Sequence, residues 1–325
     1  LSTIKQCLSM LFSLLFSLAM FYAFIGGNIL DPTNINWIDR CGQDSKTAYL
    51  GWHFYRFSPW SFPLGMNTSY GLEQSSSIVY SDSNPLFAML LKPFSAFLPD
   101  PFQYFGVWYL LCFICQAFFS WMLMSLVTSN ALLRLFGSGF FVVSPPMLAR
   151  IFPHPSLAGH FLIIVGLYML FRPSVRWRSI LWGSLLSVSV LVHAYLFAMV
   201  FCIWVADLFG RFNQRQLCSR MIGLEVLYIS LMIILLSWQS GYFISSQHVE
   251  YSGYGMYRLN VLSFFMPDGW SSALQSVDIF MSPFKKTDGF LGLGNMLLFV
   301  VACFRLLLFA CEYLLFWIRL LAFVC

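Results

Sequence analysis

An uncharged apolar segment near the N-terminus restricts what this chain can fold into. Gln6–Leu30 contains no charged side chain and is rich in Leu, Phe and Met, and Lys5 lies directly before it. A helix of about 20 residues crosses the hydrocarbon core of a bilayer. The segment is too long for the apolar part of a cleaved signal peptide, and it lacks a convincing small-x-small cleavage site. We therefore expect residues 1–30 to hold an uncleaved transmembrane helix.

Composition extends this expectation to the whole chain. Of the 325 residues, 59% are hydrophobic and 10% are charged, whereas a soluble domain carries about 25% charged residues. The basic residues behind the net charge of +5 are scattered near the ends of apolar segments, so we expect no nucleic-acid partner. Most of the 9 cysteines lie in apolar segments, including the pair Cys112 and Cys115. We interpret that pair as packed thiols rather than a redox or zinc motif.

Apolar segments and polar loops alternate along the chain, which predicts an all-α, polytopic bundle of about 8–9 transmembrane helices. After the first helix, the predicted parts are a first external loop at 31–101, transmembrane helices 2–7 at 102–240, a second external loop at 241–288, and further transmembrane helices at 289–325, where we expect the chain to be truncated. Residues 85–99 are apolar but too short to span a bilayer, and Pro93 would kink them. We expect an interfacial helix there.

One apolar segment allows two interpretations. The predicted helices or helix cores between the loops are Phe102–Leu133, Leu135–Ala149, Gly159–Phe171, Ser179–Ala206 and Val226–Trp238. Ser179–Ala206 could form one long tilted helix or a hairpin of two short ones. Arginines cluster both before and after it, and the bias of basic residues towards the cytoplasm favours the hairpin, with His193 at its outer tip. With Lys5 inside, both large loops face outward, and carboxylates gather outside while arginines gather inside.

The first loop contains an unusual combination of carboxylates and aromatic rings. Asp44 lies in the aromatic segment GQDSKTAYLGWHFYR. An ionised carboxylate among aromatic rings costs free energy unless it forms an ion pair or has a functional role. It could act as a general base, or it could pair with Lys46 or Arg56 or cap a short helix. Asp82 precedes the interfacial helix and could cap it or help to form an anion site.

Other polar residues are expected on the same outward side. Arg150 could hold a lipid phosphate, because its guanidinium matches phosphate geometry. His154 and His160 are not spaced as metal ligands on a helix, so we predict no zinc site. No phosphate-binding glycine motif, dinucleotide fingerprint or metalloprotease motif is present, which leaves nucleotide hydrolysis and Rossmann cofactors without support.

The first loop also resembles a known family. An Asp followed by Leu-Gly-Trp-x-Phe-x-Arg, then Trp-x-x-Pro-Leu-Gly and Ser-Asp-Ser-x-Pro-Leu, is similar to bacterial polytopic membrane proteins grouped with the GT-C glycosyltransferases, many of unknown function. The segments SPPMLAR with His160, His193-Ala194-Tyr195 and LNVLSFFMP extend the resemblance, which covers roughly residues 30–270.

The resemblance implies an enzyme of the bacterial inner membrane with its active face outside the cytoplasm. It would transfer a sugar from a polyprenyl-phosphate donor to a glycan or lipid acceptor of the cell envelope. Asp44 is the implied catalytic carboxylate, with Asp39 as its rival, and a divalent metal (Mg or Mn) is an open requirement. The residues expected at the substrate are Asp82, Arg150, His160, His193, Tyr195, Trp52 and Arg56.

Two alternatives remain open at the level of sequence. A flippase or transporter of lipid-linked intermediates would place ionisable residues inside its spans, and the apolar segments here are nearly free of charge. A non-catalytic envelope-assembly subunit would tolerate substitution throughout the first loop.

Overall fold

The computed structural model describes residues 2–71, 75–173, 177–216 and 218–244, with short pieces at 296–297, 299–301 and 303–305. The chain divides into two compact units, one of residues 1–143 and 147–250, the other of residues 144–146 and 251–325. Nearly all described residues belong to the first unit. The predicted second loop at 241–288 and the predicted helices at 289–325 lie almost wholly outside the described residues.

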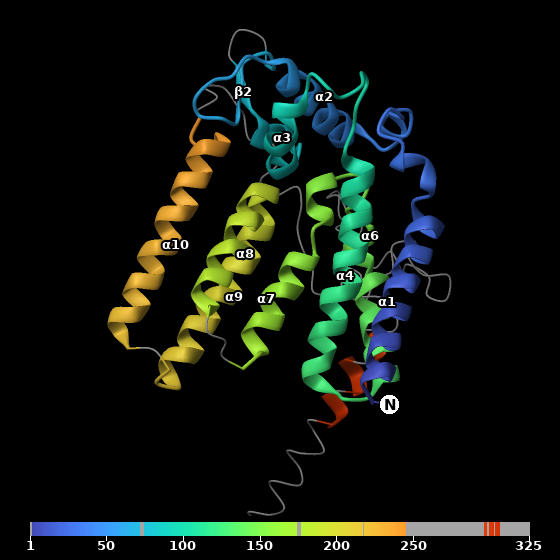
Figure 1. Cartoon of the computed structure of the whole chain (residues 1–325), viewed down its shortest axis with the longest axis vertical. Helices are drawn as coiled ribbons and strands as arrows, with labels where there is room; N and C mark the ends of the chain where they lie inside the picture. The colour runs from blue at the N-terminus through green and yellow to red at the C-terminus, as the bar shows by residue number, and fades with distance from the viewer. Residues whose placement is uncertain are drawn as a thin grey trace, which may run out of the picture. The chain divides into compact units, whose positions relative to one another are not determined.

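The first unit is built from apolar helices (Figure 1). Within the described residues, five helices are long and apolar enough to cross a membrane, and the only sheet is a two-stranded ladder. These helices are α1 (Ser2–Phe24), α4 (Phe105–Val127), α5 (Ala131–Val142) continued by α6 (Pro145–Leu148), α9 (Ala194–Asn213) and α10 (Ser219–Ser240). Two shorter apolar helices are α7 (Phe161–Phe171) and α8 (Arg178–Val192). The all-α membrane architecture is thereby confirmed in outline, while the count of 8–9 spans stays a prediction.

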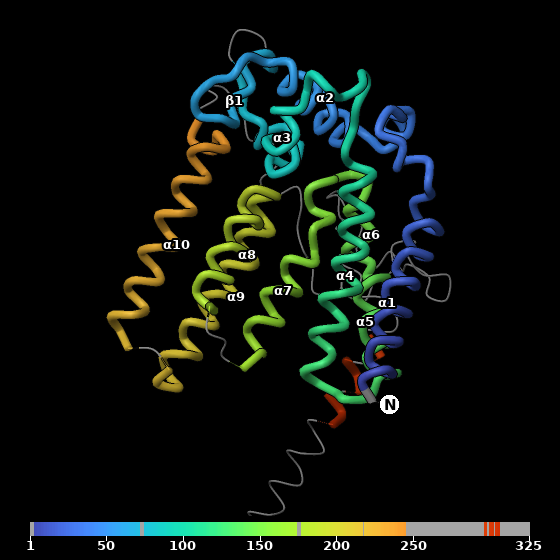
Figure 2. Tube along the Cα trace, viewed as in Figure 1, coloured from blue at the N-terminus to red at the C-terminus, as the bar shows by residue number. Residues whose placement is uncertain are grey.

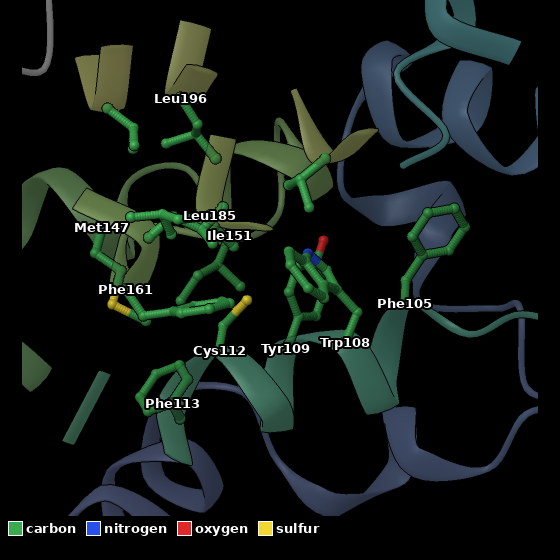
Figure 3. Packing of buried hydrophobic residues seen from close by; sticks show 14 of the residues in the cluster. Phe105, Trp108, Tyr109, Cys112, Phe113, Met147, Ile151, Phe161, Leu185 and Leu196 are labelled. Atoms are coloured by element: carbon green, nitrogen blue, oxygen red, sulfur yellow. The ribbon is translucent and has the colours of Figure 1, made fainter. Parts of the chain in front are cut away.

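The helices pack through small polar contacts and a core rich in aromatic rings. Ser13 and Ser17 lie one turn apart on α1, and their hydroxyls bond to Ser138 Oγ (2.7 Å) and to the carbonyl of Phe113 (2.6 Å). Such small residues let helix backbones approach closely inside a membrane. Figure 3 shows the apolar core around α4, in which Cys112 is buried among Phe113, Phe161 and Leu185. The thiol of Cys112 is free and packed, as its apolar segment predicts.

The first loop is folded, and it contains a helix that we did not predict. α2 (Gln43–Phe57) occupies the segment interpreted as an aromatic loop. Its core-facing side buries Ala48, Trp52 and Tyr55, which recur at helical spacing. The predicted interfacial helix at 85–99 is too long: α3 (Pro85–Leu91) passes into the 3-10 turn η5 (Lys92–Phe94). Pro93 has no N–H to donate back along the helix, which accounts for the early end.

The loop is fastened to the helices below it. Two short strands, β1 (Met66–Asn67) and β2 (Ser76–Ser77), pair antiparallel and lead into the 3-10 turn η4 (Ile78–Ser81). Beside this ladder, the N–H of Gly65 donates to the carbonyl of Gln239 (2.7 Å), and Ser77 Oγ donates to that of Ser240 (2.9 Å). The C-terminal end of α10 therefore carries one side of the loop, as Figure 1 shows.

Two predicted helix boundaries were wrong. The second helix was expected at Phe102–Leu133, but α4 ends at Val127, and α5 begins at Ala131 rather than at Leu135. Asn130 causes this break, because its side chain accepts hydrogen bonds from the N–H groups of Leu132 (2.9 Å) and Leu133 (3.3 Å) and so caps a new helix.

The hairpin interpretation of Ser179–Ala206 is confirmed. α8 and α9 pack side by side (Figure 2) and are joined at His193, whose backbone is extended at φ −167° and ψ 139°. α9 continues past the predicted end to Asn213, because Asp207 and Arg211 are neutralised inside the fold and do not end the helix.

The expected separation of carboxylates from arginines was incomplete. Asp207 in the last two turns of α9 and Glu225 in α10 are both buried, and they bind arginines that were predicted to face the cytoplasm. Arg178 pairs with Asp207, and Arg211 pairs with both Asp207 (2.8 Å) and Glu225 (2.6 Å). Trp182 and Trp204 donate their ring N–H groups to the same carboxylates. This network joins α8, α9 and α10 by buried ion pairs.

Candidate functional site

Four ionisable side chains from four segments of the chain converge where the first loop meets the helices. Asp44 lies in the first turn of α2, Asp82 follows η4, and His154 precedes the 3-10 turn η6 (Pro155–Ala158). His154 Nδ1 lies 3.7 Å from Asp44 Oδ2 and 3.9 Å from Asp82 Oδ2, so one imidazole lies between two carboxylates. His193 Nε2 lies 3.5 Å from Asp82 Oδ1. We call these four side chains the carboxylate–histidine cluster.

The backbone around Asp82 is held in an uncommon conformation. Asp82 and Asn84 have φ values of 54° and 50°, in the left-handed region that costs a non-glycine residue about 1 kcal/mol or more. Hydrogen bonds from three directions fix this turn. Ser83 Oγ donates to the carbonyl of Ala48 (2.6 Å), Ser156 Oγ donates to that of Asp82 (2.9 Å), and the Tyr104 hydroxyl donates to that of Ser83.

The surroundings of Asp82 favour its neutral form. Burial raises the pKa of Asp82 to about 7, and the negative charge of Asp44 acts in the same direction. Its Oδ1 atom is buried and has no hydrogen-bond partner within the described part of the chain. Asp82 is therefore poised to exchange a proton near neutral pH, and one of its oxygens can still accept a hydrogen bond.

His193 is fixed in one tautomer by its position between two helices. Its Nδ1 accepts the N–H of Tyr195 (3.0 Å) and so caps α9. An imidazole nitrogen that accepts a hydrogen bond carries no proton, so in neutral His193 the proton is on Nε2, which faces Asp82. Burial lowers the pKa of His193 to about 4, with a smaller contribution from His154. The side chain is therefore neutral at pH 7 and presents an N–H donor to Asp82.

Asp44 is the most solvent-exposed member of the cluster. Its side chain is 59% exposed, compared with 23% for Asp82. The rival carboxylate Asp39 is 78% exposed and forms an ion pair with Lys46 at 3.4 Å. The geometry thus joins Asp44, and not Asp39, to the histidines.

An aromatic wall adjoins the cluster on the side of Asp44. Trp37 and Tyr109 contact each other and Phe152, with ring centroids 6.0–6.2 Å apart. Ser45, next to Asp44, donates its hydroxyl to the carbonyl of Phe152. The Trp37 ring N–H and the Tyr109 hydroxyl are buried without hydrogen-bond partners in the described residues. Tyr109 is fully buried, so this ring packs in the core beneath the cluster rather than on an open face.

Trp52 and Arg56 lie in the core of the loop. The ring N–H of Trp52, which is fully buried, donates to the carbonyl of Phe102 (3.0 Å). Arg56 donates to the carbonyls of three residues after α3, namely Pro99 (2.9 Å), Ser95 (3.1 Å) and Leu98 (3.1 Å). These contacts are structural, and a role for either side chain at a substrate stays a prediction.

The remaining predicted residues are Arg150, His160 and Tyr195. Arg150 and His160 are half-buried and lie close enough for the charge of Arg150 to lower the pKa of His160, in addition to the larger effect of burial. Tyr195 is 65% exposed, and its ring packs edge-on against His193.

Sequence reasoning missed the bridging role of His154. Its position between two prolines was visible, but nothing in the sequence showed that it would face both Asp44 and Asp82. The described residues contain no group of three or more His, Cys, Asp and Glu side chains suited to a metal ion.

Comparison with known proteins adds a family but no activity. No curated protein and no solved structure matches the chain. Residues 14–325 match a family described as a domain of unknown function, DUF6311, and the chain belongs to that family.

Proposed function

We propose that this protein is an integral-membrane glycosyltransferase that moves a sugar from a polyprenyl-phosphate donor to a glycan or lipid acceptor of the bacterial cell envelope. The observation that carries the proposal is the carboxylate–histidine cluster. It brings an exposed carboxylate (Asp44) and a largely buried one (Asp82) to the same imidazole, His154. When two carboxylates lie in different environments, their pKa values differ. One can then stay ionised and accept a proton while the other keeps its proton.

The chemistry assigned to the cluster is a single displacement. The acceptor hydroxyl attacks the anomeric carbon, the bond from that carbon to the phosphate oxygen breaks, and polyprenyl phosphate leaves with the electron pair. Asp44 accepts the hydroxyl proton as general base. His154 positions Asp44, and His193 holds Asp82 through its Nε2–H. No step is assigned to Mg or Mn.

The route of the donor agrees with the absence of a nucleotide-binding motif. A polyprenyl donor arrives through the lipid, so its phosphate needs no glycine-rich cradle. Arg150, which is half-buried and close in the chain to His154, is the residue assigned to the leaving phosphate. The proposal places the reaction at the periplasmic face of the inner membrane.

The test compares two matched carboxylates of the first loop. Purified wild type, Asp44→Asn and Asp39→Asn are reconstituted in proteoliposomes with polyprenyl-phosphate hexoses labelled in the sugar. Transfer to lipid or glycan acceptors is then counted. The proposal expects Asp44→Asn to lose at least about 100-fold in rate and Asp39→Asn to stay near wild type. Full activity of Asp44→Asn would remove the assignment of the base.

One observation favours a second function, a flippase of lipid-linked intermediates. Asp207, Arg211 and Glu225 are ionisable groups buried within α9 and α10, and transporters characteristically carry such groups inside their spans. Flux of a labelled lipid-linked sugar across proteoliposomes without any new covalent product would favour this function over transfer.

A further inference from the structure

A groove runs between α9 and α10 towards the ends of these helices that lie away from the carboxylate–histidine cluster. Its inner part is a cavity of about 350 Å³ with an almost wholly apolar lining of Val205, Leu208, Phe209, Phe212, Ser219 and Ile222. Its outer part is a cavity of about 520 Å³ lined by Phe212, Asn213, Arg215, Cys218 and Ser219. Phe212 and Ser219 line both cavities, so the two cavities adjoin.

The groove is far from the cluster. His193 caps the first turn of α9, and the groove opens beyond its last residue, Asn213. On α9 the groove is lined from Val205 onward, so it lies along the second half of the helix, away from the end that His193 caps. An occupant of the groove would therefore not be the reacting end of a substrate in the cluster.

The mouth of the groove carries positive charge without compensation. Arg215 lines the outer cavity, and Arg220 follows Ser219, which lines both cavities. Both arginines are exposed, and neither forms an ion pair among the described residues. The carboxylates nearest in the sequence, Asp207 and Glu225, are buried and already bound to Arg178 and Arg211. Neither α9 nor α10 therefore has a further carboxylate that could neutralise the arginines at the mouth of the groove.

We propose that this groove binds an anionic phospholipid. One acyl chain lies in the apolar inner cavity against Leu208, Phe209 and Ile222. The phosphate lies at the mouth, where Arg215 and Arg220 supply guanidinium donors that suit its oxygens. Arginines at a membrane surface each favour an anionic lipid by about fivefold in affinity. This site is independent of the proposed glycosyl transfer.

The test measures lipid retention in nanodiscs of phosphatidylcholine with and without phosphatidylglycerol. Native mass spectrometry counts the lipid that stays with the protein. We expect phosphatidylglycerol to be retained in preference to phosphatidylcholine, and the double variant Arg215→Gln/Arg220→Gln to weaken its retention by about 25-fold. Arg40→Gln is the matched control, because Arg40 is also exposed but lies in the first loop.

Two further measurements test whether the acyl chain occupies the inner cavity and whether the bound phosphate belongs to a lipid. Val205→Phe fills the inner cavity and should lower retention of phosphatidylglycerol while both arginines stay intact. Inorganic phosphate should compete only weakly, because it has no chain to bury. Equal retention of the two lipids, an unchanged double variant, or competition by phosphate as strong as that by the lipid would each overturn the proposal.

Discussion

The Nε2 atom of His193 lies 3.5 Å from Oδ1 of Asp82 and brings the start of α9 against the first loop. The pair joins an imidazole whose pKa is lowered to about 4 to a carboxyl whose pKa is raised to about 7, so burial disfavours a full ion pair between them at neutral pH. Because Ser156 and Tyr104 fix the backbone around Asp82, this arrangement is built into the fold.

The raised pKa of Asp82 predicts a pH-dependent stability. In the unfolded chain an aspartate titrates near pH 3.9, so between about pH 4 and 7 the folded state binds a proton that the unfolded state releases. Stability from this group is present below pH 4 and is lost as the pH rises through 7, by at most about 4 kcal/mol. Asp82→Asn should flatten that slope in thermal unfolding between pH 4 and 8. The exposed Asp39→Asn should not, and an unaltered slope in Asp82→Asn would contradict this expectation.

His154 is predicted to matter for catalysis through Asp44. His154→Gln removes the imidazole that lies between Asp44 and Asp82, and we expect the kcat of transfer to fall by about 100-fold with a small change in KM. The control is His53→Gln, since His53 also faces a carboxylate, Asp100, at 3.8 Å but lies outside the cluster. Equal losses in both variants would show that the effect is not specific to the cluster.

Glu225 is predicted to hold α10 against α9. Glu225→Gln weakens a buried pair and leaves the Arg211 guanidinium with Asp207 alone, at a cost of about 3 kcal/mol. Denaturant unfolding in detergent micelles measures this loss, with Leu227→Ala, at an exposed position of the same helix, as the control. A change of less than about 0.5 kcal/mol in Glu225→Gln would mean that the network contributes little to stability.

Arg56 is predicted to order the segment that follows α3. Lysine keeps the charge but cannot reach the carbonyls of Ser95, Leu98 and Pro99 together, so Arg56→Lys should cost about 2 kcal/mol. Limited proteolysis should cut between Ser95 and Pro101 faster in this variant than in wild type or in Arg40→Lys. Equal cutting rates would show that the three hydrogen bonds are dispensable.

Most of the long helices, and their order along the chain, could be predicted from the sequence. Apolar segments are long enough to identify α1, α4 and α10, and the arginines flanking Ser179–Ala206 identified the hairpin broken at His193. These features depend on hydrophobicity and on local charge, which a single sequence carries.

The parts that could not be predicted depend on contacts between distant segments. α2 was missed because its apolar positions are mixed with His53 and Arg56, whose partners come from the segment before α4. The arginines after Ser179–Ala206 were predicted only to face the cytoplasm, and the pairing of Arg211 with Glu225 depends on the contact between α9 and α10. The cluster was visible only in part: Asp44, Asp82 and His193 were predicted as site residues, whereas their neighbour His154 was considered only as a metal ligand and was not assigned to the site.

The most direct measurement is a structure of the protein with polyprenyl phosphate bound. We expect the phosphate beside the carboxylate–histidine cluster, in contact with Arg150 or His154 and within reach of Asp44. A phosphate bound only in the groove at Arg215, with the cluster empty at saturating lipid, would contradict the assignment of the cluster as the site of sugar transfer.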